Sequence, residues 1–373
     1  MNPPGPDSRT LALHCRIDDS AAHAAVTPIY QSSAFAADSP YFYSRNDNPN
    51  VAELEGTVAL LEQARFAVAM ASGMATIQSL FELVRPGQAV VLNRLVYGCT
   101  FRLFQRMAER RGFALHLLDL SQADEWERIP PTTRLIFLET PTNPFLRTVR
   151  LSALVERVRR TAPEALIAVD NTWATPLFQK PLQHGVDISL HSGTKYFSGH
   201  SDCMSGVVLT DREDLDREFR QTRFYGGAVL SPESAWLTRR SLQTLEVRLL
   251  RQQESALAVR RFLERRPEIA RVYYPEVDGN QLTGYGGLIF FAFSEAHREG
   301  YLRFRDTLRL FGTGTGMACV TSMVAQPYTG SHASMTDEEK AAIGLGREVV
   351  RLSIGLERVE DLCDDLTTAL RAL

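Results

Sequence analysis

Lysine is scarce in this chain. Of the 41 lysine and arginine side chains in 373 residues, only Lys180, Lys195 and Lys340 are lysines. A Schiff base with an aldehyde needs a primary amine that can lose its proton, and arginine cannot supply one. Lys340 ends an acidic run typical of a solvated helix face, and Lys180 precedes a proline in a predicted surface connection. Lys195 alone follows a predicted strand among small, hydroxyl-bearing neighbours, so it is the candidate; an ordinary loop lysine is the alternative.

Cysteine pairs and metal-ligand clusters are also missing. The eight histidines show no ligand spacing. The five cysteines are odd in number, scattered and without a CxxC pair: Cys15, Cys99, Cys203, Cys319 and Cys363. This pattern argues against a disulfide framework and a zinc site, and it fits a reducing compartment. We therefore expect a cytoplasmic protein without a metal.

Long hydrophobic runs and an excess of one charge are absent as well. No apolar stretch reaches the roughly 18 residues of a membrane span, and the first eight residues lack the basic and apolar regions of a signal peptide. The formal net charge is only −3, with no asymmetry that indicates nucleic acid or an acidic membrane surface. The expected partner is a small molecule, with no nucleic acid and no membrane.

The order of predicted elements indicates an α/β protein with an arm and two domains. Residues 1–50 are rich in turn formers and are predicted to form an N-terminal arm. Strands and helices alternate through residues 51–230, which predicts a mostly parallel sheet with helices on both faces. Ser231 is a good N-cap, and the helix after it is predicted to run unbroken to about Arg265. It leads into a C-terminal substrate domain, residues 231–373.

Three polar loops follow three of the predicted strands. They are Glu139–Pro144, Asp170–Trp173 and Ser192–Lys195. Parallel α/β sheets bind ligands at the carboxyl ends of their strands, so these loops are expected to converge on one crevice. A lysine in such a crevice points to pyridoxal phosphate, the cofactor that forms an aldimine with lysine and acts as an electron sink.

The chain offers a candidate for each partner that this cofactor needs. Asp170, a carboxylate at the end of a buried strand, can keep the ring nitrogen protonated, although Asp often caps a helix instead. Tyr97 can cover the face of the ring; a packed loop tyrosine is the alternative. The phosphate needs backbone N–H groups, hydroxyls and a cation. The candidates for these groups are Gly73, Met74, Ser192, Thr194, Tyr43 and Arg45.

Arg351 is the candidate for the carboxylate of an amino-acid substrate. It alternates with Val350 and Leu352, so it faces the opposite side of a predicted strand. An arginine in such a strand is rarely buried without a partner, and its guanidinium can bind a carboxylate through two hydrogen bonds. We therefore favour a role in substrate binding over a structural one.

Several motifs, in their order along the chain, resemble those of the Cys/Met-metabolism family of pyridoxal-phosphate enzymes. This family comprises cystathionine γ-synthases, cystathionine lyases and methionine γ-lyases. The resemblance covers roughly residues 25–373. The matching segments are Tyr43-Ser44-Arg45, Asn48-Pro49, Ser72-Gly73-Met74, Tyr97-Gly98, Glu139-Thr140-Pro141-Thr142-Asn143-Pro144, Asp170-Asn171-Thr172, Ser192-Gly193-Thr194-Lys195-Tyr196, Gly199-His200-Ser201-Asp202 and Arg351-Leu352-Ser353-Ile354-Gly355-Leu356-Glu357.

The resemblance implies a particular fold and assembly. The fold is that of the fold-type I enzymes, with a mostly parallel seven-stranded large-domain sheet and a smaller C-terminal α/β domain. The assembly is a homotetramer built from two dimers, with active sites shared between subunits. In such a dimer, Tyr43 and Arg45 reach the phosphate of the neighbouring subunit.

The resemblance also implies roles for residues of the polar loops. Tyr97 would stack on the cofactor ring and Asp170 would pair with its nitrogen. Lys195 would be both the Schiff base and the proton shuttle. Thr172 and Asn143 lie in matching motifs and are expected to bind the cofactor and the substrate, respectively.

Departures from the family pattern bear on the substrate. Many members carry Ser-Leu-Gly before the last part of the substrate domain, where this chain has the glycine-rich stretch Gly312–Cys319. The connection between Tyr274 and Gly286 is also short. Cys99 stands where the methionine γ-lyases also carry Cys, and we take it as a candidate substrate contact; a small packing residue is the alternative.

We expect a lyase or transferase that eliminates or replaces the γ-substituent of an L-α-amino acid. The glycine-rich stretch has no Arg or Lys for a distal carboxylate, which favours a compact substrate with a thioether, acylated hydroxyl or halide leaving group. The alternatives are β-elimination, a cystathionine lyase or γ-synthase proper, and an aminotransferase on the same fold. A non-catalytic pyridoxal-phosphate protein leaves the joint presence of Lys195, Asp170 and Arg351 unexplained.

Overall fold

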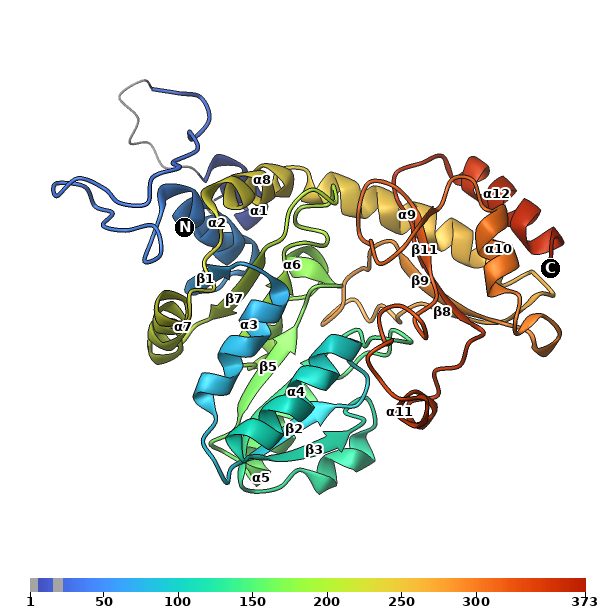
Figure 1. Ribbon diagram of the computed structural model, residues 1–373, viewed down its shortest axis with the longest axis horizontal. Coiled ribbons are helices and arrows are strands. Elements are labelled where there is room, and N and C mark those ends of the chain that lie inside the picture. Colours follow the sequence, from blue (N-terminus) through green and yellow to red (C-terminus); the bar gives the residue numbers. More distant parts are fainter. Residues whose placement is uncertain (1–5, 16–22) are drawn as a thin grey trace, which may run out of the picture.

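The computed structural model describes residues 6–15 and 23–373 and contains two sheets (Figure 1). The strands of the larger sheet are β1 (Phe66–Met70), β2 (Ala89–Asn93), β3 (Ala114–Leu118), β4 (Thr133–Glu139), β5 (Leu166–Asp170), β6 (Ile188–Ser192) and β7 (Gly206–Thr210). Their order in space is β1-β7-β6-β5-β4-β2-β3. β7 runs antiparallel to both of its neighbours, β1 and β6, and the other neighbouring strands of this sheet are parallel. The predicted seven-stranded, mostly parallel sheet is confirmed.

The α-helices of the described residues surround both sheets. They are α1 (Ser8–His14), α2 (Pro49–Glu62), α3 (Gly73–Ser79), α4 (Gly98–Arg111), α5 (Leu151–Thr161), α6 (Thr175–Phe178), α7 (Glu213–Gly226), α8 (Pro232–Leu242), α9 (Leu245–Leu263), α10 (Tyr301–Thr307), α11 (Asp337–Ala342) and α12 (Val359–Arg371). Short 3-10 turns are η1 (Leu80–Leu83), η2 (Ala123–Arg128), η3 (Pro181–His184) and η4 (Glu295–His297).

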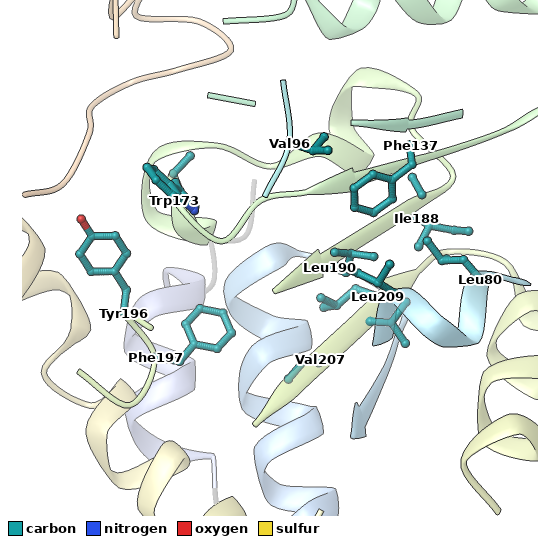
Figure 2. Close-up of a cluster of buried hydrophobic side chains, with 14 of the residues drawn as sticks. Leu80, Val96, Phe137, Trp173, Ile188, Leu190, Tyr196, Phe197, Val207 and Leu209 are labelled. Atoms are coloured by element: carbon teal, nitrogen blue, oxygen red, sulfur yellow. The ribbon is translucent and has the colours of Figure 1, made fainter. Parts of the chain in front are cut away.

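Successive side chains of a strand point to opposite faces of the sheet. Both faces of the larger sheet therefore carry apolar side chains, and helices cover both of them. Phe137 of β4 packs in one hydrophobic cluster with α3 and α4, and its ring centroid lies 5.2 Å from that of Phe104. Ile136, the preceding residue, packs on the other face with α5. Figure 2 shows Phe137 beside Leu190 and Leu209 in the first cluster. This two-sided burial explains why the strands are apolar at nearly every position.

The helix predicted to run unbroken to about Arg265 is two helices, α8 and α9, so that prediction was wrong. They are separated at residues 243–244. The buried guanidinium of Arg248 accounts for the interruption: it donates to the carbonyl of Ser241 at 2.9 Å and to that of Tyr196 at 2.8 Å. Carbonyls at a helix end need such partners. No glycine or proline marks this end in the sequence.

The smaller sheet belongs to the C-terminal part of the chain. Its strands are β8 (Ile269–Tyr273), β9 (Leu288–Phe293), β10 (Gly312–Thr313), β11 (Met323–Ala325) and β12 (Val349–Ser353), in the spatial order β10-β11-β12-β9-β8. Figure 1 shows α9 (gold) running from the large domain to this sheet. Val350 and Leu352 of β12 pack in the hydrophobic cluster of this domain, as predicted. Arg351 between them points to the opposite side, where its guanidinium contacts the carbonyl of Thr315.

The arm is more regular than predicted, because α1 lies within it and Ala34 forms an isolated β-bridge with Tyr43. The segment between residue 23 and α2 extends away from the larger sheet in Figure 1 (blue, left). Residues 1–5 and 16–22, which the arm prediction includes, lie outside the described residues. The domain limits at 50 and 230 stay predictions.

The described residues contain neither a membrane-spanning helix nor a metal-binding cluster. Across residues 6–15 and 23–373, no helix has the length and apolar character needed to cross a membrane. In the same residues, no three His, Cys, Asp or Glu side chains gather closely enough to hold a metal ion. All five cysteines are free thiols.

Candidate active site

A cavity of about 310 Å³ opens at the carboxyl ends of β4, β5 and β6. The last residue of each strand lies in its wall: Glu139, Asp170 and Ser192. The structure thus brings the three predicted polar loops together, while the chemical roles of their residues stay predictions. The predicted site residues that line the cavity are Gly73, Met74, Tyr97, Asn143, Asp170, Thr172, Ser192, Thr194 and Lys195.

Lys195 is the lysine that the cavity contains. A tight turn after β6 presents it, in which the Lys195 N–H donates to the carbonyl of Ser192 at 3.1 Å. In the described part of the chain, its Nζ has no hydrogen bond and no ion pair, whereas Lys180 Nζ donates to a carbonyl and Lys340 Nζ pairs with Asp337. Burial and the nearby charge of Arg351 lower the pKa of Lys195. A partly buried amine without a partner is suited to covalent chemistry.

Asp170 lies beside it at the end of β5. Its Oδ1 accepts hydrogen bonds from the backbone N–H and the hydroxyl of Thr172, and that hydroxyl accepts from the N–H of Ser192 at 2.7 Å. The helix-cap alternative does not match the structure, since α6 begins at Thr175 with Ala174 as its N-cap. Burial raises the pKa of Asp170, while the Thr172 donors and the charges of His191 and Lys195 act in the opposite direction.

The predicted phosphate ligands gather where the start of α3 meets β6. Ser72 caps α3 by accepting from the N–H of Ala75 at 3.2 Å, which leaves Gly73 and Met74 in its first turn. A Cβ on Gly73 would lie only 2.7 Å from Cβ of Ser192, so this contact requires glycine. The close approach places backbone N–H groups beside the hydroxyl of Ser192.

Tyr97 caps α4 and is tied to the sheet, because its N–H donates to Oε1 of Glu139 at 2.7 Å. Burial raises the pKa of its hydroxyl, and a hydrogen bond with the side chain of Cys99 adds to this. Cys99 itself is solvent-exposed and is not part of the cavity wall. The structure therefore places this predicted substrate contact beside Tyr97 and outside the cavity.

Arg351 approaches the cavity from the C-terminal domain. It lines an adjoining cavity of about 650 Å³, which shares the wall residues Thr315, Gly330 and Ser331 with the first. Its guanidinium donates to the carbonyl of Gly316 at 3.0 Å. Among the described residues it has no carboxylate partner, and its buried Nε has no hydrogen bond. Burial lowers the pKa of Arg351 to about 10, so it stays charged at neutral pH.

The two arm residues do not reach this cavity in the single chain. Arg45 donates to the carbonyl of Phe224 at 2.6 Å, and its Cζ lies 4.2 Å from the centre of the Phe224 ring. Tyr43 lies beside it, with the Arg45 Cζ 5.4 Å from its ring centre. Neither residue belongs to the cavity wall.

Sequence reasoning left several wall residues without a role, among them Glu139, Met317 and Ser331. Glu139 carried a usable signal, because it is the last residue of a strand whose loop was already singled out. Ser331 carried none, since it lies in an irregular segment of the C-terminal domain. A Cβ on Gly98 would lie 2.6 Å from the Ser331 carbonyl, so close packing against α4 brings this segment to the cavity.

The family relationship is now clear. The chain matches the family described as Cys/Met metabolism PLP-dependent enzyme over residues 9–371. The chain belongs to this family. Its cofactor is accordingly pyridoxal phosphate, as predicted.

Individual relatives agree with this assignment. The chain is 36% identical to a cystathionine gamma-lyase of Dictyostelium discoideum, with 94% of each chain covered. It is also 36% identical to an L-methionine gamma-lyase of Fusobacterium nucleatum subsp. polymorphum, with 98% of each covered. It superposes on a crystal structure of cystathionine gamma synthase from Xanthomonas oryzae pv. oryzae, in complex with aminoacrylate and cysteine, with a TM-score of 0.94; that pair is 34% identical and 99% of each chain is covered.

The cavity has the chemistry that this cofactor needs. It offers one free amine, a buried carboxylate, a tyrosine at one wall, and small residues with hydroxyls at a helix start. Three buried polar atoms of its wall have no partner among the described residues: Glu139 Oε2, Asn143 Oδ1 and Thr100 Oγ1. Buried polar atoms are normally hydrogen-bonded, so these atoms fit a site that a polar ligand completes.

Proposed function

We propose that this chain eliminates or replaces the γ-substituent of an L-α-amino acid. The observation that carries the proposal is the state of two cations: Lys195 has an amine without a partner in the cavity, and Arg351 has a buried guanidinium without a carboxylate at the adjoining wall. An amino acid has an α-carboxylate that can pair with Arg351 and an α-proton that Lys195 can remove. Relatives named γ-lyase and γ-synthase support the γ-position.

Arg351 and Lys195 hold and deprotonate the substrate. A guanidinium binds a carboxylate through two parallel hydrogen bonds, so Arg351 takes the α-carboxylate and orients the Cα–H bond. Lys195 then removes the α-proton, since burial lowers its pKa and increases the share of free amine at neutral pH. When bound, pyridoxal phosphate withdraws electrons from the α-carbon. Lys195 also carries the proton onward, which allows the γ-group to leave.

The remaining wall residues would hold the cofactor. Asp170 would keep the ring nitrogen protonated through its negative charge. Tyr97 would cover one face of the ring, and Thr172 holds Asp170 in place through two hydrogen bonds. The N–H groups of Gly73 and Met74 would bind the phosphate together with the hydroxyls of Ser192 and Thr194.

The substrate is a compact amino acid. Lys195 is the only Arg or Lys among the described residues that line the cavity. A distal carboxylate would therefore be buried there without a cation, which is unfavourable. A thioether, an acylated hydroxyl or a halide at the γ-position meets no such difficulty. Asn143 contributes to the substrate side, and Cys99 acts there only through Tyr97.

A second candidate is cystathionine, whose distal end carries charge. The adjoining cavity contains Arg305 and Arg347, and it meets the first cavity at Thr315 and Ser331. A long substrate that passes between these two residues finds cations for a distal carboxylate. This route favours a cystathionine lyase or a γ-synthase proper.

A substrate panel tests these candidates. The loaded enzyme is incubated with methionine, an O-acylhomoserine, a γ-halo amino acid and cystathionine, and the products are identified by mass spectrometry. Ammonia and 2-oxobutanoate from the short substrates, with a higher kcat/KM than for cystathionine, support the compact substrate. Preference for cystathionine supports the second candidate. Pyruvate alone shows β-elimination, and a 2-oxo acid that keeps its γ-group shows transamination; either result contradicts the proposal.

The active unit is an oligomer in which the arm completes a neighbouring site, and the family resemblance implies two such dimers. Arg45 and Tyr43 lie outside the wall of their own cavity, and Phe42 beside them is 78% exposed. Tyr225, next to the carbonyl that holds Arg45, is 79% exposed. Apolar side chains gathered in this way are typical of an interface. The five free cysteines support a reducing, cytoplasmic location.

A further inference from the structure

Two carboxylates stand side by side at the cavity. Glu139 and Asp170 are register partners at the ends of the parallel strands β4 and β5, and both line the cavity. Glu139 is only 3% exposed. Neighbouring carboxyl groups that line one cavity disfavour each other's ionised form, and burial of Glu139 adds to this, so one of the two holds a proton.

The hydrogen bonds identify which of the two carboxyl groups holds the proton. Asp170 accepts two bonds from Thr172, and the neighbouring basic groups His191 and Lys195 act to lower its pKa. Glu139 accepts a single bond from the backbone of Tyr97 through Oε1, and its Oε2 has no partner in the described residues. Hydrogen-bond donors and nearby cations stabilise the ionised form of a carboxyl group. The negative charge therefore belongs to Asp170 and the proton to Glu139.

Comparison with the other buried glutamates strengthens this assignment. Glu53 pairs with Arg239 at 2.8 Å, Glu55 with Arg223 at 2.6 Å, and Glu62 with His191 at 3.0 Å. Among the buried glutamates that the structure describes, only Glu139 has no basic partner. A buried carboxylate without a cation is strongly disfavoured, and the group takes up a proton instead.

We propose that Glu139 is a neutral carboxylic acid that positions Tyr97 through Oε1, carries its proton on Oε2, and leaves Asp170 as the single negative charge facing the cofactor ring. This is a positioning role, and it rests on the proposed functions of Asp170 and Tyr97. Burial and the charge of Asp170 raise the pKa of Glu139 well above its usual value, in agreement. Among the described residues, the hydroxyl of Tyr285 also interacts electrostatically with Glu139, as Tyr97 does.

The first test detects the proton on Glu139 directly and needs no cofactor. Infrared difference spectra at neutral pH compare the cofactor-free full-length chain with Glu139→Gln, which preserves the shape of the side chain. We expect the difference to show loss of a protonated carboxyl band. Loss of carboxylate bands instead would overturn the proposal. The control is Glu254→Gln, at an exposed side chain paired with Arg251, which should lose carboxylate bands only.

Asp170→Asn tests whether the neighbouring charge holds the proton in place. Removing a like charge lowers the pKa of Glu139, so its protonated band should disappear at a lower pH than in the parent chain. An unchanged titration of the band would contradict the pairing of these two carboxyl groups. This measurement is also made on the cofactor-free chain, because we expect Asp170→Asn to weaken cofactor binding.

A measurement on the cofactor-loaded enzyme tests the protonation state of Glu139 independently. A neutral Glu139 contributes no charge to the cavity, so Glu139→Gln should leave the pH of the visible absorbance transition of the bound cofactor unchanged. An ionised Glu139 would instead support the protonated cofactor, and its replacement by Gln would lower that pH by about 1 to 3 units. If the parent chain binds no cofactor, the proposed function fails, while the infrared result still decides the state of Glu139.

Discussion

The two cations of the proposed site are held in opposite ways. Lys195 stands on a tight turn at the end of a buried strand, and its Nζ has no partner in the described residues. Arg351 lies in the middle of β12, and its guanidinium is in contact with the carbonyls of Thr315 and Gly316 and with the sulfur of Met317. One cation is free to react, and the other is held by neutral groups.

The two cations also belong to parts of the site that are built differently. The large-domain cavity is built from strand ends, whose positions are fixed by sheet register. The wall beside Arg351 is built from a glycine-rich loop, in which Gly314 has a φ of +127° that favours glycine. We infer that the strand ends determine the reaction, whereas the loop determines which substrate is accepted.

Replacing Lys195 should have the largest effect. Lys195→Ala removes both the covalent attachment point and the base, so kcat should fall by at least ~10³-fold. Borohydride reduction of the loaded parent enzyme, followed by peptide mapping, should find the cofactor mass on Lys195. Lys180→Arg is the matched control and should retain activity, since Lys180 Nζ only donates to the carbonyl of Pro176. Cofactor mass on Lys180 or Lys340 would end this assignment.

Replacing Asp170 should have the next largest effect. Asp170→Ala removes the charge that keeps the ring nitrogen protonated, and kcat/KM should fall by about 10²- to 10³-fold. The dissociation constant of the cofactor, measured by absorbance, should rise as well. Thr172→Val is the graded companion: it removes one donor to Asp170 and should have a smaller effect in the same direction. Near-normal turnover in Asp170→Ala would show that this carboxylate has no catalytic role.

Replacing Arg351 tests the second cation of the site. Arg351→Ala should lower kcat/KM by about 10- to 150-fold, the value of a charged hydrogen-bonded contact. Arg351→Lys keeps the charge but loses the second hydrogen bond, so it should recover only part of this loss. Arg347→Ala should affect cystathionine and leave the short substrates unchanged if the second candidate holds. An equal loss of kcat/KM for all substrates would show that Arg347 does not select between them.

Mixing variants tests whether the arm serves a neighbouring subunit. Arg45→Ala and Lys195→Ala are each expected to be inactive, but a hybrid dimer contains one intact site. Random mixing in equal amounts should then restore about a quarter of the sites, since half of the dimers are hybrids with one good site of two. Native mass spectrometry confirms that hybrids form. No recovery in confirmed hybrids would mean that the arm completes its own site.

The smallest expected effect is on stability. The pKa of Lys195 in the folded chain lies below its ordinary value of 10.5 because of burial, so the unfolded chain binds the proton first as the pH falls. The contribution of Lys195 to the stability of the cofactor-free chain therefore becomes unfavourable as the pH falls below 10.5 and levels off below the pKa of the folded chain. Lys195→Met removes this effect and should be more stable at neutral pH, and the pH-dependent part of the difference should vanish above 10.5. Urea unfolding at several pH values checks the trend.

Much of this site was readable from the sequence. Lys195 stood out because lysine is scarce, and Arg351 because it interrupts an apolar strand. The alternation of strands and helices predicted a mostly parallel sheet, and such a sheet brings the carboxyl ends of its strands to one crevice whatever the details of packing. These conclusions depend on local pattern and on general rules of topology, which a sequence carries by itself.

Tertiary structure decided the rest. The end of α8 depends on Arg248, whose guanidinium comes from the next helix, and no local signal marks it. Cys99 lies outside the cavity because of how α4 begins, although its position in the sequence is adjacent to the site. The pairing of Glu139 with Asp170 depends on the register of two strands separated by a whole helix. Protonation, burial and the choice of partner arise from groups distant along the chain, so only their arrangement in space could determine them.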